Sequence, residues 1–242
     1  MPAPGAGILI RWENAPGPYE VVFSTREGGV SEGPWSSLNL GRMTGDEPER
    51  VDENRRRVCA EAGADPDALA LNYQCHSADV LRARPAARDD RADGLWTDEP
   101  GLPVLALSAD CLPIALARAN GDRPALAVLH AGWRGLLAGI AEAGVRALGG
   151  GRVTAIVGPG IGPCCYEVGG DVSTDFERAF GAGLTQDGRL DLWTAAERAL
   201  QAAGCERVER LDLCTSCAPQ RFFSHRRDGE TTGRQGVIGR IR

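Results

Sequence analysis

The sequence predicts an α/β fold, and three observations support this prediction. Short apolar runs typical of buried strands recur along the chain, segments with helical periodicity lie between several of them, and turns rich in Gly or Pro separate the two kinds of segment. The chain has 242 residues, 43% apolar and 25% charged, which are ordinary values for a globular protein. Because we find no repeat, low-complexity tract or linker, we expect residues 1–242 to form a single domain.

Apolar runs mark the expected strands. In chain order they lie at 7–10, 19–23, within 69–80, and at 102–108, 114–118, 124–129, 153–157, 207–213 and around 237–238. Amphipathic periodicity and end signals predict helices at 46–63, 134–148, 171–180 and 191–203. In the first helix Asp46 with Glu49 fits a capping box, Pro48 suits the first turn and Gly63 suits the end. We interpret 82–93, which is polar and contains proline, as a surface loop.

Charge and composition exclude several classes of protein. The net charge of −6 argues against a general nucleic-acid or membrane binder, because those partners favour basic surfaces. No apolar stretch is long enough to span a membrane, and the N-terminus lacks the pattern of a secretory signal. The chain has eight cysteines, which we expect to be free thiols in a reducing cytoplasm.

His130 lies at the point where a predicted strand ends and a predicted helix begins. In α/β sheets this edge is where ligands tend to bind, and Gly132 and Gly135 allow the backbone to approach a ligand closely. Taken alone, His130 could equally be a core histidine whose ring bonds to a carbonyl group.

Two other segments carry a metal-ligating residue at or near a predicted strand end. They are Gln74-Cys75-His76 and Asp110-Cys111. Two imidazoles and one thiolate, gathered from separate strand ends, match a catalytic zinc site that keeps its fourth position open. Asp79 or Asp110 could orient a ligand or serve as a general base.

These segments closely resemble the polyphenol-oxidase or laccase-domain family, also called YfiH-like. The segments that carry the resemblance are Ser24–Ser31, Leu38–Gly41, Gln74-Cys75-His76-Ser77, Ala109-Asp110-Cys111-Leu112-Pro113, His130-Ala131-Gly132-Trp133-Arg134-Gly135, Gly158-Pro159-Gly160-Ile161 and Phe222–Asp228. The resemblance implies a single mixed α+β domain of layered mixed sheets flanked by helices. It also implies that His76, Cys111 and His130 bind Zn²⁺, with copper as a second possible metal.

The activities that the resemblance implies are purine nucleoside phosphorylase activity on adenosine, inosine and S-methyl-5′-thioadenosine, and hydrolytic deamination of adenosine. A bound metal would lower the pKa of water and polarise the reacting groups. We assign catalysis to the three ligands and Asp110, and leave His225 out of the ligand set. The expected partners are purine nucleosides and phosphate, without nucleic acid or membrane, for a monomer or small homo-oligomer.

Phosphorolysis needs positive charge that holds phosphate against the ribose. Arg26, beside two glycines, and Arg134, beside His130, are our candidates, with Arg226 behind them. Asn39 could hydrogen-bond the ribose or the base. Each arginine could instead form a surface ion pair, and the loop around Arg26 could be a plain connector.

Four other kinds of protein could be proposed from the same residues. A multicopper laccase is excluded, because three histidines cannot build its copper centres, and a single blue-copper site lacks a methionine within the motifs. A cysteine amide hydrolase that edits peptidoglycan precursors would use Cys111 as nucleophile. A non-enzymatic protein with a structural zinc is a further reading. Cys164-Cys165 and Cys214-x-x-Cys217 could form such a site, but adjacent cysteines suit tetrahedral ligation poorly, so we interpret these four as buried thiols.

Overall fold

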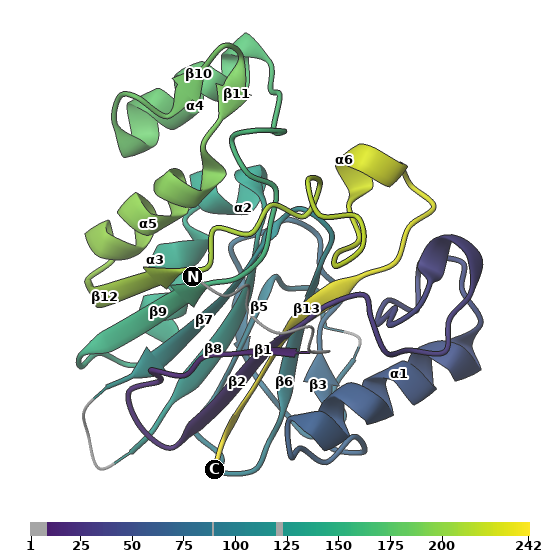
Figure 1. Ribbon diagram of the computed structural model, residues 1–242. Helices are drawn as coiled ribbons and strands as arrows, with labels where there is room; N and C mark the ends of the chain where they lie inside the picture. The colour runs from purple at the N-terminus through teal and green to yellow at the C-terminus, as the bar shows by residue number, and fades with distance from the viewer. Residues whose placement is uncertain (1–8, 89, 120–122) are drawn as a thin grey trace.

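Two mixed β-sheets packed face to face form the centre of the molecule, with helices on both outer faces (Figure 1). The computed structural model describes residues 9–88, 90–119 and 123–242. The six-stranded sheet has the order β12 (Cys205–Arg210), β9 (Val153–Val157), β7 (Leu112–Arg118), β8 (Leu126–Ala131), β5 (Gly94–Thr97) and β4 (Val80–Arg82). The five-stranded sheet has the order β1 (Leu9–Arg11), β2 (Tyr19–Ser24), β13 (Gln235–Ile241), β6 (Val104–Ser108) and β3 (Ala70–Leu71). A short hairpin joins β10 (Thr185–Gln186) to β11 (Arg189–Leu190).

Strand β7 shows why the sequence forms this layered core. Successive side chains of a strand point to opposite faces, so Leu112, Ile114 and Leu116 pack toward the helices, whereas Ala115 and Ala117 pack toward the other sheet. All five side chains are buried. Because both faces of this strand are covered, it is apolar from Leu112 to Ala117.

The helices divide between the two outer faces. The helix α1 (Pro48–Glu61) packs on the five-stranded sheet, where Val58 and Cys59 contact Val22 and Leu105 within one apolar cluster. The other face carries the remaining long helices, which are α2 (Trp133–Leu137), α3 (Ile140–Ala147), α4 (Gly170–Phe180) and α5 (Leu192–Ala202). Two short helices complete the chain, η1 (Gly33–Trp35) and α6 (His225–Asp228).

The predicted fold class is confirmed, and two local predictions are wrong. The helix expected over 134–148 is divided at Gly139, whose φ of 93° is left-handed and lies outside helical geometry. The capping box at Asp46 does not form, because its carboxylate accepts hydrogen bonds from Ser31 and Asn39 while Glu47 is the residue that precedes the helix. Residues 7 and 8 of the first expected strand lie outside the described residues.

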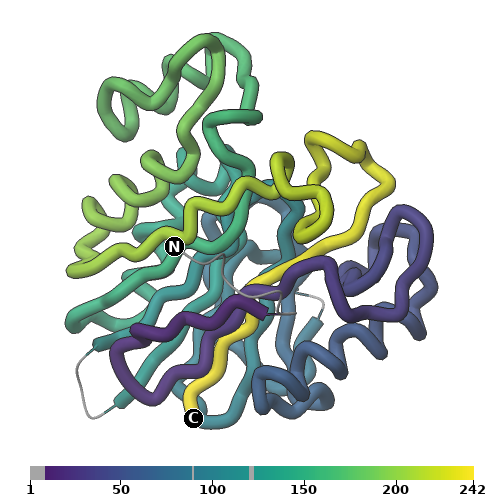
Figure 2. Tube along the Cα trace, in the orientation of Figure 1, coloured from purple at the N-terminus to yellow at the C-terminus, as the bar shows by residue number. Residues whose placement is uncertain are grey.

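Segments far apart in the sequence meet above one end of the sheets. The chain that runs from β12 toward α6 lies beside the loop that follows β9, and Gly160 pairs with Cys214 between them (Figure 2). Strands β6 and β8, one from each sheet, end beneath these loops at Ser108 and Ala131. In the described part of the chain, no helix is long and apolar enough to cross a lipid bilayer.

Candidate active site

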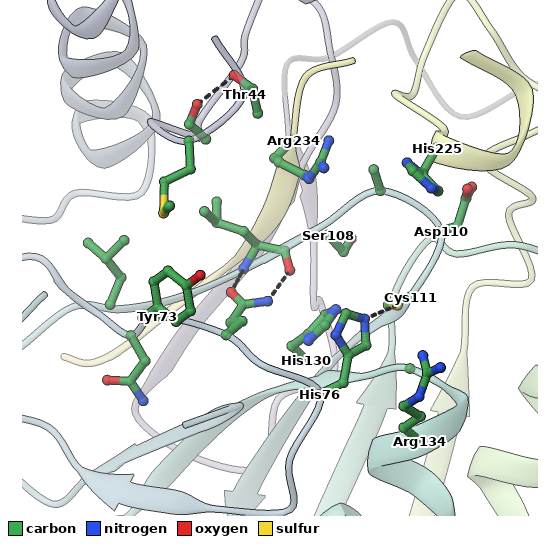
Figure 3. A pocket seen from close by; sticks show the side chains of 18 of the residues that line it. Thr44, Tyr73, His76, Ser108, Asp110, Cys111, His130, Arg134, His225 and Arg234 are labelled. Atoms are coloured by element: carbon green, nitrogen blue, oxygen red, sulfur yellow. Dashed lines mark hydrogen bonds between the residues drawn. The ribbon is translucent and has the colours of Figure 1, made fainter. Parts of the chain in front are cut away.

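The structure brings His76, Cys111 and His130 together. One ligand atom from each lies within 4.8 Å of the others, and the Cys111 Sγ is 3.8 Å from the His76 Nε2 (Figure 3). His76 comes from the loop after β3, Cys111 immediately precedes β7, and His130 is near the end of β8. The two imidazole rings lie edge to face, with centroids 4.9 Å apart.

Asp93 positions two of these three side chains. Its carboxylate is buried and accepts a hydrogen bond of 2.8 Å from the Nδ1 of His130. This bond orients the imidazole so that its other nitrogen, Nε2, remains available to a ligand in the site. The same carboxylate accepts the backbone N–H groups of Cys75, His76 and Ser77, at 3.1, 3.0 and 2.6 Å. His76 has a left-handed φ of 61°, so Asp93 also holds a loop conformation that is uncommon for histidine.

Charges within the site favour a thiolate at Cys111. Burial raises the pKa of the thiol, but the charge of His130 and hydrogen bonds from both histidines outweigh it and lower that pKa to about 6. Burial lowers the pKa of His130, whereas Cys111 and Asp93 raise it to about 9. Because metals bind the thiolate rather than the thiol, these neighbours prepare Cys111 to be a ligand.

Gly132 leaves the space that the ligands occupy. A Cβ atom at this position would lie 2.8 Å from the Cys111 Sγ and 3.0 Å from the His76 Cδ2. A side chain here would therefore push the two ligands apart. The donor set, the oriented imidazole and this cleared space together fit a divalent metal ion with nitrogen and sulfur ligands.

The three residues line a cavity of about 1110 Å³. Among the described residues, its lining holds seven arginines and only one carboxylate, that of Asp110. The arginines are Arg42, Arg55, Arg88, Arg91, Arg134, Arg226 and Arg234. A cavity with this excess of positive charge attracts anions, although the chain as a whole carries a net charge of −6.

Asp110 lies beside Cys111 in the cavity wall, held from two sides. Its carboxylate accepts hydrogen bonds of 2.6 Å from the Thr215 hydroxyl and the Arg226 backbone N–H. Its φ of 93° is strained for a residue other than glycine. These bonds fix the carboxylate within reach of a bound molecule while they hold the turn that presents Cys111.

The predicted substrate contacts separate into two pairs. Arg134 and Arg226 line the cavity, with their guanidinium groups over the rings of Trp133 and Tyr166. Figure 3 shows Arg134 beside the ligand group, and Arg234 on another side of it.

The structure places neither Arg26 nor Asn39 in the lining of the cavity. Arg26 donates to the carbonyl groups of Ser36 and Pro219 and stacks on Phe223, so it joins two loops. Asn39 is fully buried, and its amide bonds to neighbouring groups, the Arg234 backbone among them. Neither residue enters the function proposed below.

Sequence reasoning missed three residues of the site, namely Asp93, Ser108 and Arg234. Asp93 ends the segment interpreted as a surface loop, and Asp79, which was considered in its place, has an exposed side chain. Arg234 follows a Thr-Gly pair near the C-terminus. The Ser108 hydroxyl is buried in the cavity wall and has no hydrogen-bond partner among the described residues. Of these three residues, only Ser108 has a sequence feature that indicates a site residue, namely its position at the end of an apolar strand.

Residues 20–241 match the family described as multi-copper polyphenol oxidoreductase laccase. The chain belongs to this family. Among curated relatives of this laccase family, a protein of Pseudomonas aeruginosa named purine nucleoside phosphorylase PA4543 is 39% identical over 227 residues, covering 90% of this chain and 91% of that protein. The Escherichia coli protein named purine nucleoside phosphorylase YfiH is 40% identical over 237 residues, covering 94% and 95%.

Solved structures show the same fold. YlmD from Geobacillus stearothermophilus superposes with a TM-score of 0.90 at 31% identity, covering 99% of this chain and 98% of that one. The Neisseria meningitidis protein NMB0706 superposes with a TM-score of 0.88 at 32% identity, covering 97% and 99%. The predicted family resemblance is therefore confirmed over nearly the whole chain.

Proposed function

We propose that this chain is a metal-dependent purine nucleoside phosphorylase. The observation that carries the proposal is the group of His76, Cys111 and His130 in the wall of a cavity lined by seven arginines. Relatives of about 40% identity that carry this enzyme name support the same activity.

The proposed reaction matches the charge of the cavity. Phosphorolysis breaks the bond between ribose C1′ and the purine nitrogen and forms a bond between C1′ and a phosphate oxygen, which yields ribose 1-phosphate and the free base. Phosphate brings the negative charge, and Arg134, Arg226 and Arg234 would hold it. The neutral nucleoside would use the Ser108 hydroxyl and the exposed ring of Tyr73, which also lines the cavity.

His76, Cys111 and His130 would hold the metal, for which we propose Zn²⁺. Zinc prefers this mixture of imidazole and thiolate ligands, and a site with three protein ligands keeps one position free for catalysis. Such a metal supplies Lewis acidity at an oxygen atom. A copper ion would accept the same donors, but neither methionine of the sequence belongs to the motifs that carry these three residues.

We further propose that adenosine, inosine and S-methyl-5′-thioadenosine are substrates and that adenosine is also deaminated. A volume of about 1110 Å³ is larger than a nucleoside needs, which leaves room for a 5′-methylthio group. Deamination requires water at the same place, and the exposed His76 and the partly buried Cys111 leave the ligand group open to solvent. All eight cysteines are free, which supports a reducing cytoplasmic setting.

Nucleoside turnover with and without phosphate tests the proposal. We expect the protein to release hypoxanthine and ribose 1-phosphate from inosine only when phosphate is present, and His130→Ala to lose both activity and the metal ion of this group. His225→Ala is the matched control for metal content, because it removes an imidazole from the same cavity but outside the ligand group. Hypoxanthine release that ignores phosphate, or a fully active His130→Ala variant, would refute the proposal.

The Cys111–His130 pair also favours the second candidate, a cysteine amide hydrolase acting on peptidoglycan precursors. Alkylation by iodoacetamide separates the two candidates. A metal-bound thiolate reacts slowly until a chelator removes the metal, whereas a free nucleophile reacts at once. Rapid alkylation of Cys111 in the metal-replete protein would favour the hydrolase.

A further inference from the structure

The chain contains a second group of metal-ligating side chains outside the cavity lining. Cys164, Cys165, Cys214 and Cys217 place their four Sγ atoms within 4.8 Å of one another. The Cys217 Sγ lies 3.3 Å from the Sγ atoms of both Cys164 and Cys165. The interpretation of these residues as buried thiols is wrong, because Cys164 and Cys217 are exposed.

Two loops converge to form this group, which we call the four-cysteine cluster. One is the loop after β9 and the other is the segment between β12 and α6, which lie side by side in Figure 2. The Gly160 N–H donates to the Leu213 carbonyl at 3.1 Å, and the Thr215 N–H donates to the Gly160 carbonyl at 3.1 Å. These bonds fix the distance between the two cysteine pairs before any ion binds.

The adjacent pair can converge because it lies in a turn. In a strand, neighbouring side chains would point to opposite faces. Here residues 163–165 form a turn closed by the Cys165 N–H on the Gly162 carbonyl, so both sulfur atoms reach Cys217. On the other loop Cys214 and Cys217 have the C-x-x-C spacing, and the Gly162 N–H donates to the Cys214 Sγ at 3.3 Å. Backbone N–H groups of this kind stabilise sulfur ligands that carry negative charge.

We propose that the four-cysteine cluster binds a thiophilic divalent cation, with Zn²⁺ as the expected ion, in a site distinct from the catalytic one. Zinc–sulfur bonds of about 2.3 Å place the sulfur atoms of a tetrahedral site about 3.8 Å apart, which falls between the 3.3 Å of two of these pairs and the 4.8 Å that contains all four sulfur atoms. Four protein ligands complete the coordination, so the site is structural. The cluster has no carboxylate or imidazole member, which distinguishes it from the catalytic group.

The cluster supports the wall of the cavity. Thr215, between the two cysteines of the C-x-x-C pair, donates to Asp110, and Tyr166, next to Cys165, lines the cavity beneath Arg226. Arg227 of α6 donates to the carbonyl groups of Thr215 and Ser216, at 2.8 and 3.3 Å. An ion bound by the cluster would therefore hold the two loops that carry Tyr166 and Thr215, the second of which bonds to Asp110.

Metal content per chain tests the proposal. We expect full-length protein purified with a thiol reductant to contain two metal ions per chain by elemental mass spectrometry. The variant carrying Cys164→Ser and Cys217→Ser should retain one ion, and so should Cys111→Ser. Cys205→Ala, which removes a thiol outside both groups, is the control and should retain two. The proposal would be overturned if the variant with both Cys164→Ser and Cys217→Ser contained as many metal ions per chain as the wild type.

Cobalt substitution gives a second measurement that does not depend on folding of the variant. With Co²⁺ as the probe, the wild-type chain should show near-ultraviolet thiolate bands about five times as intense as a one-thiolate site, since five thiolates would bind. A one-thiolate spectrum would overturn the proposal. Intact-mass analysis of protein alkylated without prior reduction would do the same if it showed a disulfide between the two loops.

Discussion

Removal of the Asp93 carboxylate is the most informative change to the site. In Asp93→Asn, one carboxylate oxygen becomes an NH₂ group that faces hydrogen-bond donors. If it replaces Oδ1, the His76 N–H and His130 lose their acceptor, and if it replaces Oδ2, the backbone N–H groups of Cys75 and Ser77 lose theirs. At least two donors are left without an acceptor in either orientation.

These losses set the expected magnitudes. An unsatisfied donor costs about 1–3 kcal/mol, so the metal-free variant should lose at least about 2 kcal/mol of unfolding free energy. Loss of the partner of a ligating histidine typically weakens metal binding 10- to 100-fold, which corresponds to about 1.4–2.8 kcal/mol. Urea unfolding of the metal-free protein measures the first quantity, and competition with a chromophoric chelator measures the second.

Asp79→Asn is the matched control, because Asp79 is an exposed carboxylate close to the same loop. It should change metal affinity less than twofold. Wild-type affinity in Asp93→Asn would refute the role of Asp93, and equal losses in both variants would show that general negative charge, rather than the hydrogen bonds, stabilises the metal.

Three further changes test other parts of the structure. Gly132→Ala should reduce metal affinity by at least tenfold in the same chelator titration, since its Cβ would lie 2.8 Å from the Cys111 Sγ. Gly169→Ala is the control and should have no effect, because a Cβ at that position has no atom of the described residues within 4 Å. Ser108→Ala should leave the unfolding free energy within about 0.5 kcal/mol of wild type, because the hydroxyl has no hydrogen-bond partner in the described part of the protein. It should lower kcat/KM for inosine about fivefold, which corresponds to the loss of one hydrogen bond of about 1 kcal/mol to the substrate. An unchanged kcat/KM would show that Ser108 does not contact the substrate. Burial raises the pKa of the Tyr19 hydroxyl above 10, so the contribution of this hydroxyl to stability is complete below pH 10 and is lost at higher pH. Tyr19→Phe should therefore be less stable than wild type by about 1 kcal/mol at pH 8 and by less at pH 11. A difference in urea unfolding that stays constant between these pH values would contradict this reasoning.

The sequence predicts the fold class and the ligand group because both depend on local pattern. Alternating or continuous apolar runs identified β6, β7, β8 and β9, and three of the expected helices lie close to their predicted positions. His76, Cys111 and His130 each lie close to the end of such a run, so the meeting of strand ends at one edge accounts for their convergence.

Long-range hydrogen bonds account for what the sequence did not predict. Asp93 is 37 positions from His130 and ends a polar segment, and nothing in its neighbours indicates a buried carboxylate. Arg26 sits in a glycine-rich loop that could hold an anion, yet its guanidinium donates hydrogen bonds to carbonyl groups that include that of Pro219, 193 positions away. The spacing of residues in the sequence cannot indicate which polar side chains form hydrogen bonds to distant parts of the chain.

The group of His76, Cys111 and His130 and the four-cysteine cluster share one connecting element, the turn at Asp110. Its left-handed backbone costs about 1–3 kcal/mol, and it persists because the carboxylate accepts bonds from Thr215 and from the Arg226 N–H. Thr215 belongs to the loop of the C-x-x-C pair, and Cys111 directly follows the strained residue. The position of the Cys111 thiolate therefore depends on a loop more than 100 positions later in the chain, and an ion bound to that loop would stabilise the strained turn from outside the cavity lining.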